Sequence, residues 1–259
     1  MSAPRHIVYL LAMALVSASA VAQSESIESI QAAAKKGSAM AQFELGSRYL
    51  NGKETTRNDK EAVNWLQKSA KQGYPQAQQL LGFCYAVGLG VQGNPDQAFL
   101  WYSKAAVQGL ADAQYKIAFC LEKGMGTLKS DSEAATWYRK AAEQGLADAQ
   151  LALAICYDEE RGVKRDYRQK LHWYLAAAEQ GLAQAQVKVA RCYYYGQGVD
   201  ERDYAEAYKW ALIAERNGSD EANELLEALR KNYEKRITPE HLAEGEKRAN
   251  SFKPKISRR

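Results

Sequence analysis

Apolar and polar residues recur along this chain with a helical spacing, and the whole pattern returns after about 36 residues. In the first half of each period, apolar or small residues fall at i, i+1 and i+4, as in Leu45, Gly46 and Tyr49, on one face of a helix. The second half follows the form A-x-x-W-x-x-x-A-A, as in residues 98–106, which also has one apolar side. Each period therefore predicts two amphipathic helices.

Tryptophan, cysteine and glycine fix the length of the period. The tryptophans are 36, 36, 36 and 37 residues apart and the cysteines are each 36 apart: Trp65, Trp101, Trp137, Trp173, Trp210, and Cys84, Cys120, Cys156, Cys192. A glycine opens each unit, so the repeats run 37–72, 73–108, 109–144, 145–180 and 181–217, and a sixth unit from Gly218 diverges. This period indicates stacked two-helix units, because one unit alone cannot bury both of its apolar faces.

Local signals predict where the helices begin and end. A glycine follows the first helix of four units, which favours a left-handed C-terminal cap, whereas the fourth unit has Glu160 there. These glycines are Gly52, Gly88, Gly124 and Gly196. Before each second helix stands Asn, Ser or Asp, with Glu or Gln three residues later, which is a capping-box pattern in all five units. The N-cap residues are Asn58, Asn94, Ser130, Asp166 and Asp203.

The two ends of the array differ from its middle. Residues 26–36 predict a lone second helix, and 23–36 is therefore expected to be an N-terminal capping segment. Residues 218–259 hold the divergent sixth unit, a polar helix that starts at Thr238-Pro239, and a basic tail from Lys253 to Arg259. The predicted fold is all-α, a right-handed α/α solenoid of five repeats with terminal capping helices.

The first 22 residues match a secretory signal peptide. Arg5 precedes an apolar run over 7–16, and Ala20-Val21-Ala22 forms a small-x-small cleavage site. A membrane anchor is the alternative, but ten apolar residues are too few to span a bilayer. No cysteine precedes Cys84, so lipid attachment after the signal is not expected. We expect cleavage after Ala22, a periplasmic or secreted product, and no membrane span in the mature chain.

Composition narrows the class of partner. Apolar residues make up 46% of the chain and charged residues 25%, which is typical of a folded soluble protein. The formal net charge is only +4, and nucleic-acid binding would require a concentrated basic face. We therefore expect a monomer with no nucleic-acid partner.

The repeat resembles a known family. The motif A-x-A-Q-x-x-L-G-x-x-Y-x-x-G-x-G-V, followed by D-x-x-x-A-x-x-W-Y-x-K-A-A-x-Q-G, is similar to the Sel-one-like repeat over residues 37–217. That family forms α-solenoids related to tetratricopeptide repeats, and the resemblance implies an interaction scaffold without chemistry of its own. A cysteine-rich secreted branch has a similar cysteine after the L-G motif. Its second cysteine in each unit is missing here, so its disulfides do not carry over.

Catalytic and metal-binding patterns are weak in this sequence. Equivalent cysteines in stacked helices lie about 8–10 Å apart, too far for a disulfide, so we expect four buried, reduced thiols. His172 and His241 have no evident partner, and no catalytic motif, metal ligand set or cofactor site is expected.

Two alternative functions remain open: an envelope enzyme, such as a lactam or cell-wall hydrolase by analogy with the cysteine-rich relatives, and a module that binds cell-wall glycan through exposed tyrosines.

Binding is expected where the repeats differ from one another. First-helix positions outside the core should line the concave face, and there the first units are apolar, the middle units acidic and the last unit rich in tyrosine. The tyrosines either anchor a partner or pack against the sixth unit, and the sequence favours neither. The tryptophans are expected in the core. The partner-binding candidates are Phe83, Phe119, Glu122, Asp158, Glu159, Tyr194 and Tyr195. The predicted function is a non-catalytic scaffold for a protein or peptide.

Overall fold

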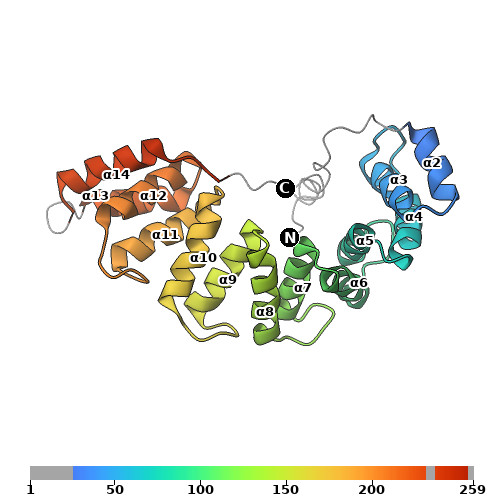
Figure 1. The fold of residues 1–259 in the computed structure, drawn as a ribbon, viewed down its shortest axis with the longest axis horizontal. Coiled ribbons are helices and arrows are strands. Elements are labelled where there is room, and N and C mark those ends of the chain that lie inside the picture. The colour runs from blue at the N-terminus through green and yellow to red at the C-terminus, as the bar shows by residue number, and fades with distance from the viewer. Residues whose placement is uncertain (1–25, 232–236, 256–259) are drawn as a thin grey trace.

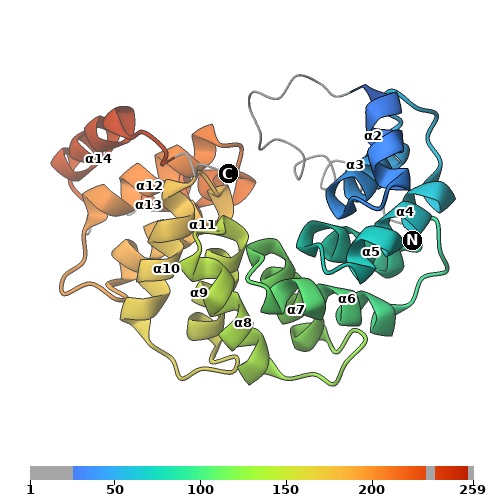
Figure 2. The same cartoon turned by 45° about the vertical axis from the view of Figure 1, so that its right-hand side comes forward.

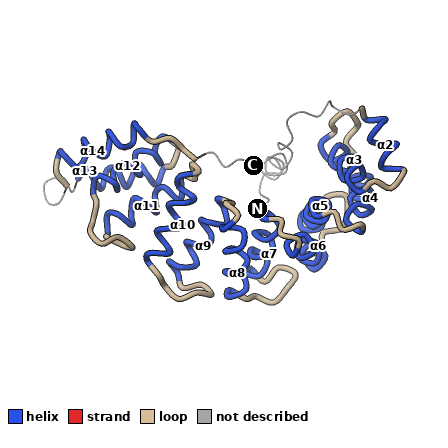
Figure 3. The backbone as a smooth tube through the Cα atoms, in the orientation of Figure 1, coloured by secondary structure: helices blue, strands red, loops and turns tan. Residues whose placement is uncertain are grey.

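The computed structural model describes residues 26–231 and 237–255, and the predicted signal peptide lies outside these residues. All regular elements of the described part are α-helices (Figure 3). They are α2 Ile27–Lys35, α3 Ala39–Asn51, α4 Asp59–Lys71, α5 Pro75–Val87, α6 Pro95–Val107, α7 Ala111–Lys123, α8 Asp131–Glu143, α9 Ala147–Glu159, α10 Tyr167–Glu179, α11 Ala183–Tyr195, α12 Tyr204–Arg216, α13 Asp220–Lys231 and α14 Pro239–Ser251.

Successive helices pack as antiparallel pairs that stack into an arc (Figure 1). The first helix of each unit contacts the second helix of its own unit most extensively and the second helix of the preceding unit next. In the middle of the arc, α5 and α7 lie toward its hollow side, and α6 and α8 lie outside them (Figure 1). The predicted all-α solenoid is confirmed, and α2 takes the role of a lone second helix packed on α3.

The second helices begin as half of the predicted capping box. In all five units the N-cap side chain accepts a hydrogen bond from the amide three residues later, as in Asn58 with Glu61 at 3.1 Å. The reciprocal half is replaced in the first three units. There the N-cap amide donates to a carbonyl nine residues upstream, at 2.9–3.0 Å: Asn58 to Tyr49, Asn94 to Tyr85, and Ser130 to Leu121. This bond ties the start of the second helix to the end of the first.

A glycine two residues after the C-cap of the first helix allows neighbouring units to approach in four of the five units. A Cβ atom on Gly90, Gly126, Gly162 or Gly198 would lie 2.0–2.1 Å from a backbone carbonyl oxygen of the preceding unit's second helix. The first unit has Glu54 at this position, also with positive φ. A glycine is therefore found at this position where two units are in close backbone contact.

Small residues allow the two helices of a unit to pack closely, and the tryptophans pack against the core. The Gly46 position is Gly or Ala in all five units, and at Gly82 an added Cβ would lie 2.8 Å from the ring of Tyr102. The tryptophans are buried or half-buried against the hydrophobic clusters, as predicted. A lysine Nζ lies 3.9–4.2 Å from the ring centroid of three of them, Trp65, Trp101 and Trp137.

A ladder of glutamines, whose role the sequence pattern alone does not reveal, joins the units. One glutamine near the start of each first helix is buried and donates to a carbonyl eight residues upstream, at 3.0–3.2 Å: Gln42, Gln78, Gln114, Gln150 and Gln186. Its own oxygen accepts from an amide side chain at the end of the same unit's second helix, at 2.7–2.9 Å: Gln72, Gln108, Gln144, Gln180 and Asn217. Each rung therefore clamps a first helix between two second helices.

The C-terminal helix closes the array by lying along α12 (Figure 2). A Cβ on Gly245 would lie 2.6 Å from the Ala205 carbonyl oxygen, so the two helices cross closely there. Arg248 reaches Asp203 and Glu206 at 3.2 and 3.1 Å, and the ring of Phe252 lies 5.2 Å from that of Trp210. His241, for which the sequence suggested no partner, completes a full capping box with Thr238.

Candidate binding surface

Five positions of each first helix face the same side and form what we call the inner stripe. They are the second, fifth, ninth, twelfth and thirteenth residues of the helix, which fall within about one third of its circumference. They lie away from the residues that pack on the second helices, such as Leu45 and Gly46. All seven candidates predicted from the sequence belong to this stripe.

Phe83 and Phe119 occupy the ninth position of α5 and α7. Phe83 is half-buried and packs against the cluster around Tyr102, and Phe119 is 38% exposed. The Lys123 Nζ lies 5.9 Å from the Phe119 ring centroid. Part of each aromatic ring therefore remains open to solvent on two adjacent units.

The Glu122 side chain takes part in a network of hydrogen bonds and ion pairs within the solenoid. Its carboxylate accepts hydrogen bonds from the Tyr138 hydroxyl at 2.8 Å, from Arg161 at 2.7 Å and from Lys123 at 2.8 Å. Burial opposes ionisation of this carboxyl, but the bonds from Lys123 and Tyr138 and the charge of Arg161 outweigh it, so its pKa lies below the usual value. Glu159 lies 3.0 Å from Arg161 and is more exposed. Glu122 therefore joins two units.

Asp158 has a similar role one unit later. Its carboxylate accepts from Lys170 at 2.8 Å and from the Tyr174 hydroxyl at 3.4 Å. Lys170 is buried where the other units carry alanine, and its ammonium also donates to Gln197 of the next unit at 2.8 Å. The acidic middle predicted from the sequence is present, but Glu122 and Asp158 are already paired with groups of this chain.

The two tyrosines at the end of α11 have different environments. Tyr194 is half-buried and packs edge to face on Tyr195 at 4.9 Å and on Tyr204 at 5.8 Å. Tyr204 in turn lies 5.6 Å from the ring of His241. Tyr195 is 58% exposed. Tyr194 thus packs within its own unit and supports Tyr195, which presents most of its ring to solvent.

The four cysteines are free and buried, as the sequence predicted. Burial raises the pKa of the Cys84 thiol to about 12 and those of Cys120, Cys156 and Cys192 to about 11. The thiolate is the reactive form of cysteine, so these groups are poor nucleophiles and metal ligands at neutral pH.

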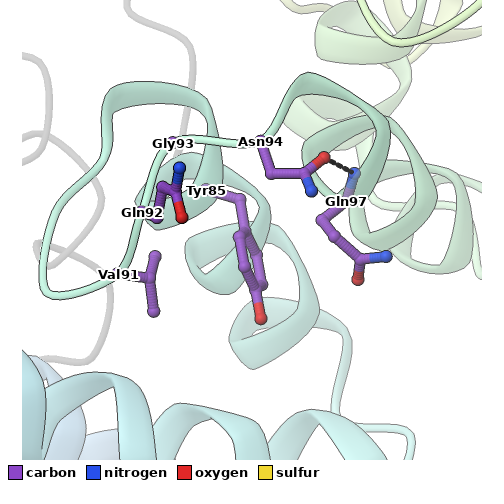
Figure 4. Close-up of a pocket in the computed structure, with 6 residues that line it drawn as sticks. All are labelled: Tyr85, Val91, Gln92, Gly93, Asn94 and Gln97. Carbon is purple, nitrogen blue, oxygen red and sulfur yellow. Dashed lines mark hydrogen bonds between the residues drawn. The ribbon is translucent and has the colours of Figure 1, made fainter.

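An open hollow in the turn of the second unit is lined by residues that already have structural roles (Figure 4). Asn94 caps α6 through the Gln97 amide at 3.0 Å, and the Tyr85 hydroxyl accepts from Gln67 at 3.3 Å. The other lining residues are Val91, Gln92 and Gly93. No acid, base or thiol lines this hollow. Among the described residues no group of three or more metal-ligating side chains is placed to hold a metal, and no helix could cross a membrane.

Comparison with known families agrees with this architecture. The family model for the Sel1 repeat matches five consecutive segments, 39–74, 75–110, 111–146, 147–182 and 183–219. The chain belongs to the Sel1 repeat family. This is the Sel-one-like repeat expected from the sequence, and it forms scaffolds that commonly serve protein interaction.

Two solved structures show the same fold. A Sel1 repeat protein from Oxalobacter formigenes is 30% identical, with a TM-score of 0.75, and the match covers 94% of this chain and 99% of that one. The protein c5321, a protective antigen present in uropathogenic Escherichia coli strains, is 33% identical with a TM-score of 0.77. That match covers 86% of this chain and 48% of the antigen, so this chain spans about half of the antigen's length. No curated protein matches the sequence.

Proposed function

We propose that this protein is a non-catalytic scaffold of the cell envelope, periplasmic or secreted, that binds a protein or peptide on its inner stripe. One observation carries the proposal. Nine large hydrophobic side chains are exposed among the described residues, and four of them lie in the inner stripe: Met40, Val87, Phe119 and Tyr195. The stripe contains only 25 residues, so exposed apolar groups are concentrated on it.

The exposed groups have the chemistry of interface anchors. Large aromatic side chains carry much of the binding energy at protein interfaces when a partner covers them. Phe119 and Tyr195 are the exposed aromatics of the stripe. The ring of Tyr195 is braced by Tyr194, so little side-chain entropy is lost when a partner orders it. The ion pairs of Glu122 and Asp158 hold the units between these two anchors in place.

The test compares two matched double variants. Phe119→Ala with Tyr195→Ala removes two exposed apolar side chains from the inner stripe, and Leu100→Ala with Val107→Ala removes two from the outer side of α6. Immobilised mature protein is incubated with envelope extract, and retained molecules are identified by mass spectrometry. The first variant should lose about tenfold or more of the retained protein, and the second should retain it like the wild type.

Three other outcomes would contradict the proposal. Equal retention by both variants would place the binding face elsewhere. Retention of glycan in place of protein would indicate a cell-wall binding module, for which the Tyr195–Tyr194–Tyr204 run is the candidate. Turnover of a cell-wall or lactam substrate by the purified protein would indicate an enzyme.

The envelope location is tested separately. The proposal requires export and cleavage after Ala22, so N-terminal sequencing of the exported protein should start at Gln23. Recovery of the uncleaved chain from the cytoplasm would contradict the proposed location but not the binding face.

A further inference from the structure

Two adjacent glutamines on α5 are equally buried, but within the part of the chain that the structure describes only the side chain of the first forms hydrogen bonds. Gln78 and Gln79 are each 5% exposed. The Gln78 amide donates to the Ala70 carbonyl at 3.1 Å and accepts from Gln108 at 2.7 Å. The Gln79 side-chain amide forms no hydrogen bond among the described residues, and it is not one of the fully buried polar groups that lack a partner, so it keeps some contact with solvent.

Gln79 lies in the inner stripe beside the open aromatic rings. It is the fifth residue of α5 and precedes Phe83 by one helical turn on the same side. At the equivalent position of α3, Phe43 packs its ring 5.3 Å from Tyr74 at the start of the next first helix. Gln79 therefore lies at the junction of α5 and α7. The other units have Phe43, Tyr115, Leu151 and Val187 at this position.

The inner stripe of the first two units has no charged residues, and this limits the kind of partner that can bind there. In units one and two its ten residues are all uncharged: Met40, Phe43, Ser47, Leu50, Asn51, Gln76, Gln79, Phe83, Ala86 and Val87. In the next two units the same positions include Asp112, Glu122, Lys123, Asp148, Asp158 and Glu159. A charged group of a partner placed over the first two units would lose its hydration without gaining an opposite charge in the stripe.

We propose that Gln79, Phe83 and Phe119 form a subsite for an uncharged, apolar segment of the partner in an extended conformation, with the Gln79 amide paired to one of its peptide groups. The primary amide offers both a donor and an acceptor, as a peptide group does. A helical partner uses its backbone groups internally, so only an extended one has them free for Gln79. This inference rests on the proposed function, since it assumes that a partner covers the inner stripe.

The experiment uses short peptides. A phage-displayed library of random peptides is selected on the immobilised mature wild-type protein, and an enriched peptide is labelled for anisotropy titration. The enriched sequences should be apolar and uncharged. Gln79→Leu keeps the size of the side chain and removes the amide, so it should weaken peptide binding about tenfold while the thermal midpoint stays or rises. N-methylation of one peptide amide should cause a similar loss on the wild type and none on the variant.

Gln78→Leu is the matched control. It should lower the thermal midpoint, because it leaves the Ala70 carbonyl and the Gln108 amide unpaired, and the folded protein should bind the peptide like the wild type. Equal binding by Gln79→Leu and wild type would overturn the inference, as would enrichment of charged or helical peptides. If Phe119→Ala still weakens binding in that case, the proposed function stands. If no peptide is enriched, or none depends on Phe119, the proposed function fails as well.

Discussion

Glu160 ends α9 in the same left-handed conformation in which Gly124 ends α7. Their φ angles are 57° and 67°, and each backbone amide bonds to the carbonyl of the cysteine four residues earlier. Glycine adopts this conformation without steric cost, whereas a residue with a Cβ atom is strained by about 1 kcal/mol. The ion pair of Glu160 with Arg165 joins two exposed side chains and offsets little of this cost.

Glu160→Gly should therefore stabilise the protein by about 0.5–1 kcal/mol, because it relieves the strain at the cap of α9. Chemical denaturation of the mature protein measures the change. Gly124→Glu is the reverse control and should destabilise by a similar amount or more. If Glu160→Gly lowers stability, the side chain of Glu160 makes a contribution that the cap geometry does not explain.

Gly126→Ala should cost much more stability than Gly124→Ala, although both glycines have positive φ. The added Cβ at Gly126 would lie 2.1 Å from the Pro95 carbonyl oxygen, whereas at Gly124 the nearest atom is 3.6 Å away. We expect about 1 kcal/mol for Gly124→Ala and about 2–4 kcal/mol for Gly126→Ala, since only the latter must separate two units. Equal losses in thermal or urea unfolding would show that the junction between units adapts easily.

The four thiols should resist alkylation while the protein is folded. Burial raises the pKa of these thiols to about 11 or 12, so their thiolate fraction at pH 8 is very small. Iodoacetamide should label the unreduced native protein slowly and label four cysteines after denaturation, as counted by intact mass. Recovery of disulfide-linked peptides, or rapid labelling of the native protein, would contradict the buried free thiols.

Glu122 should stabilise the protein in a pH-dependent way. Its pKa is lowered in the folded state, so its contribution is present above the unfolded pKa near 4.5 and is lost as the pH falls through the lower folded value. Glu122→Gln should cost about 1–3 kcal/mol at pH 7, because the bonds from Tyr138 and Arg161 weaken. In urea unfolding the difference from wild type should shrink below about pH 4. A difference that does not change with pH would argue against an ionised, paired Glu122.

Much of the fold could be predicted from the sequence because its signals are local and repeated. Helix periodicity, the N-cap residues and the glycines after the first helices each act within a few residues, and the structure confirms them. The half-formed capping box shows the limit. The N-cap amide of Asn58 donates to the Tyr49 carbonyl, which the turn brings within reach, and the spacing of Asn58 and Glu61 alone cannot reveal this bond.

Contacts between residues far apart in the sequence were harder to predict, because the partners lie 30 to 40 residues apart, either in one unit or in neighbouring units. The rung between Gln72 and Gln42 spans 30 residues, and the pair of Glu122 with Arg161 spans 39. Both glutamines recur every 36 residues, so a search for periodic polar residues would have identified the ladder. The pair of Glu122 and Arg161 occurs once, and no repeat pattern points to it. Gln79 likewise occurs once, since the other units have apolar residues at its position, and no repeat pattern points to its role.

Site-specific photo-crosslinking tests the binding face most directly. A photoreactive phenylalanine analogue replaces Phe119 on the inner stripe in one variant and Val107 on the outer side of α6 in another, and both side chains are exposed in the free protein. The full-length chain is produced in its native host and irradiated in intact cells. We predict a discrete crosslinked protein from position 119 and none from position 107. Crosslinks from position 107 alone, or equal crosslinks from both positions, would contradict a scaffold that binds through its inner stripe.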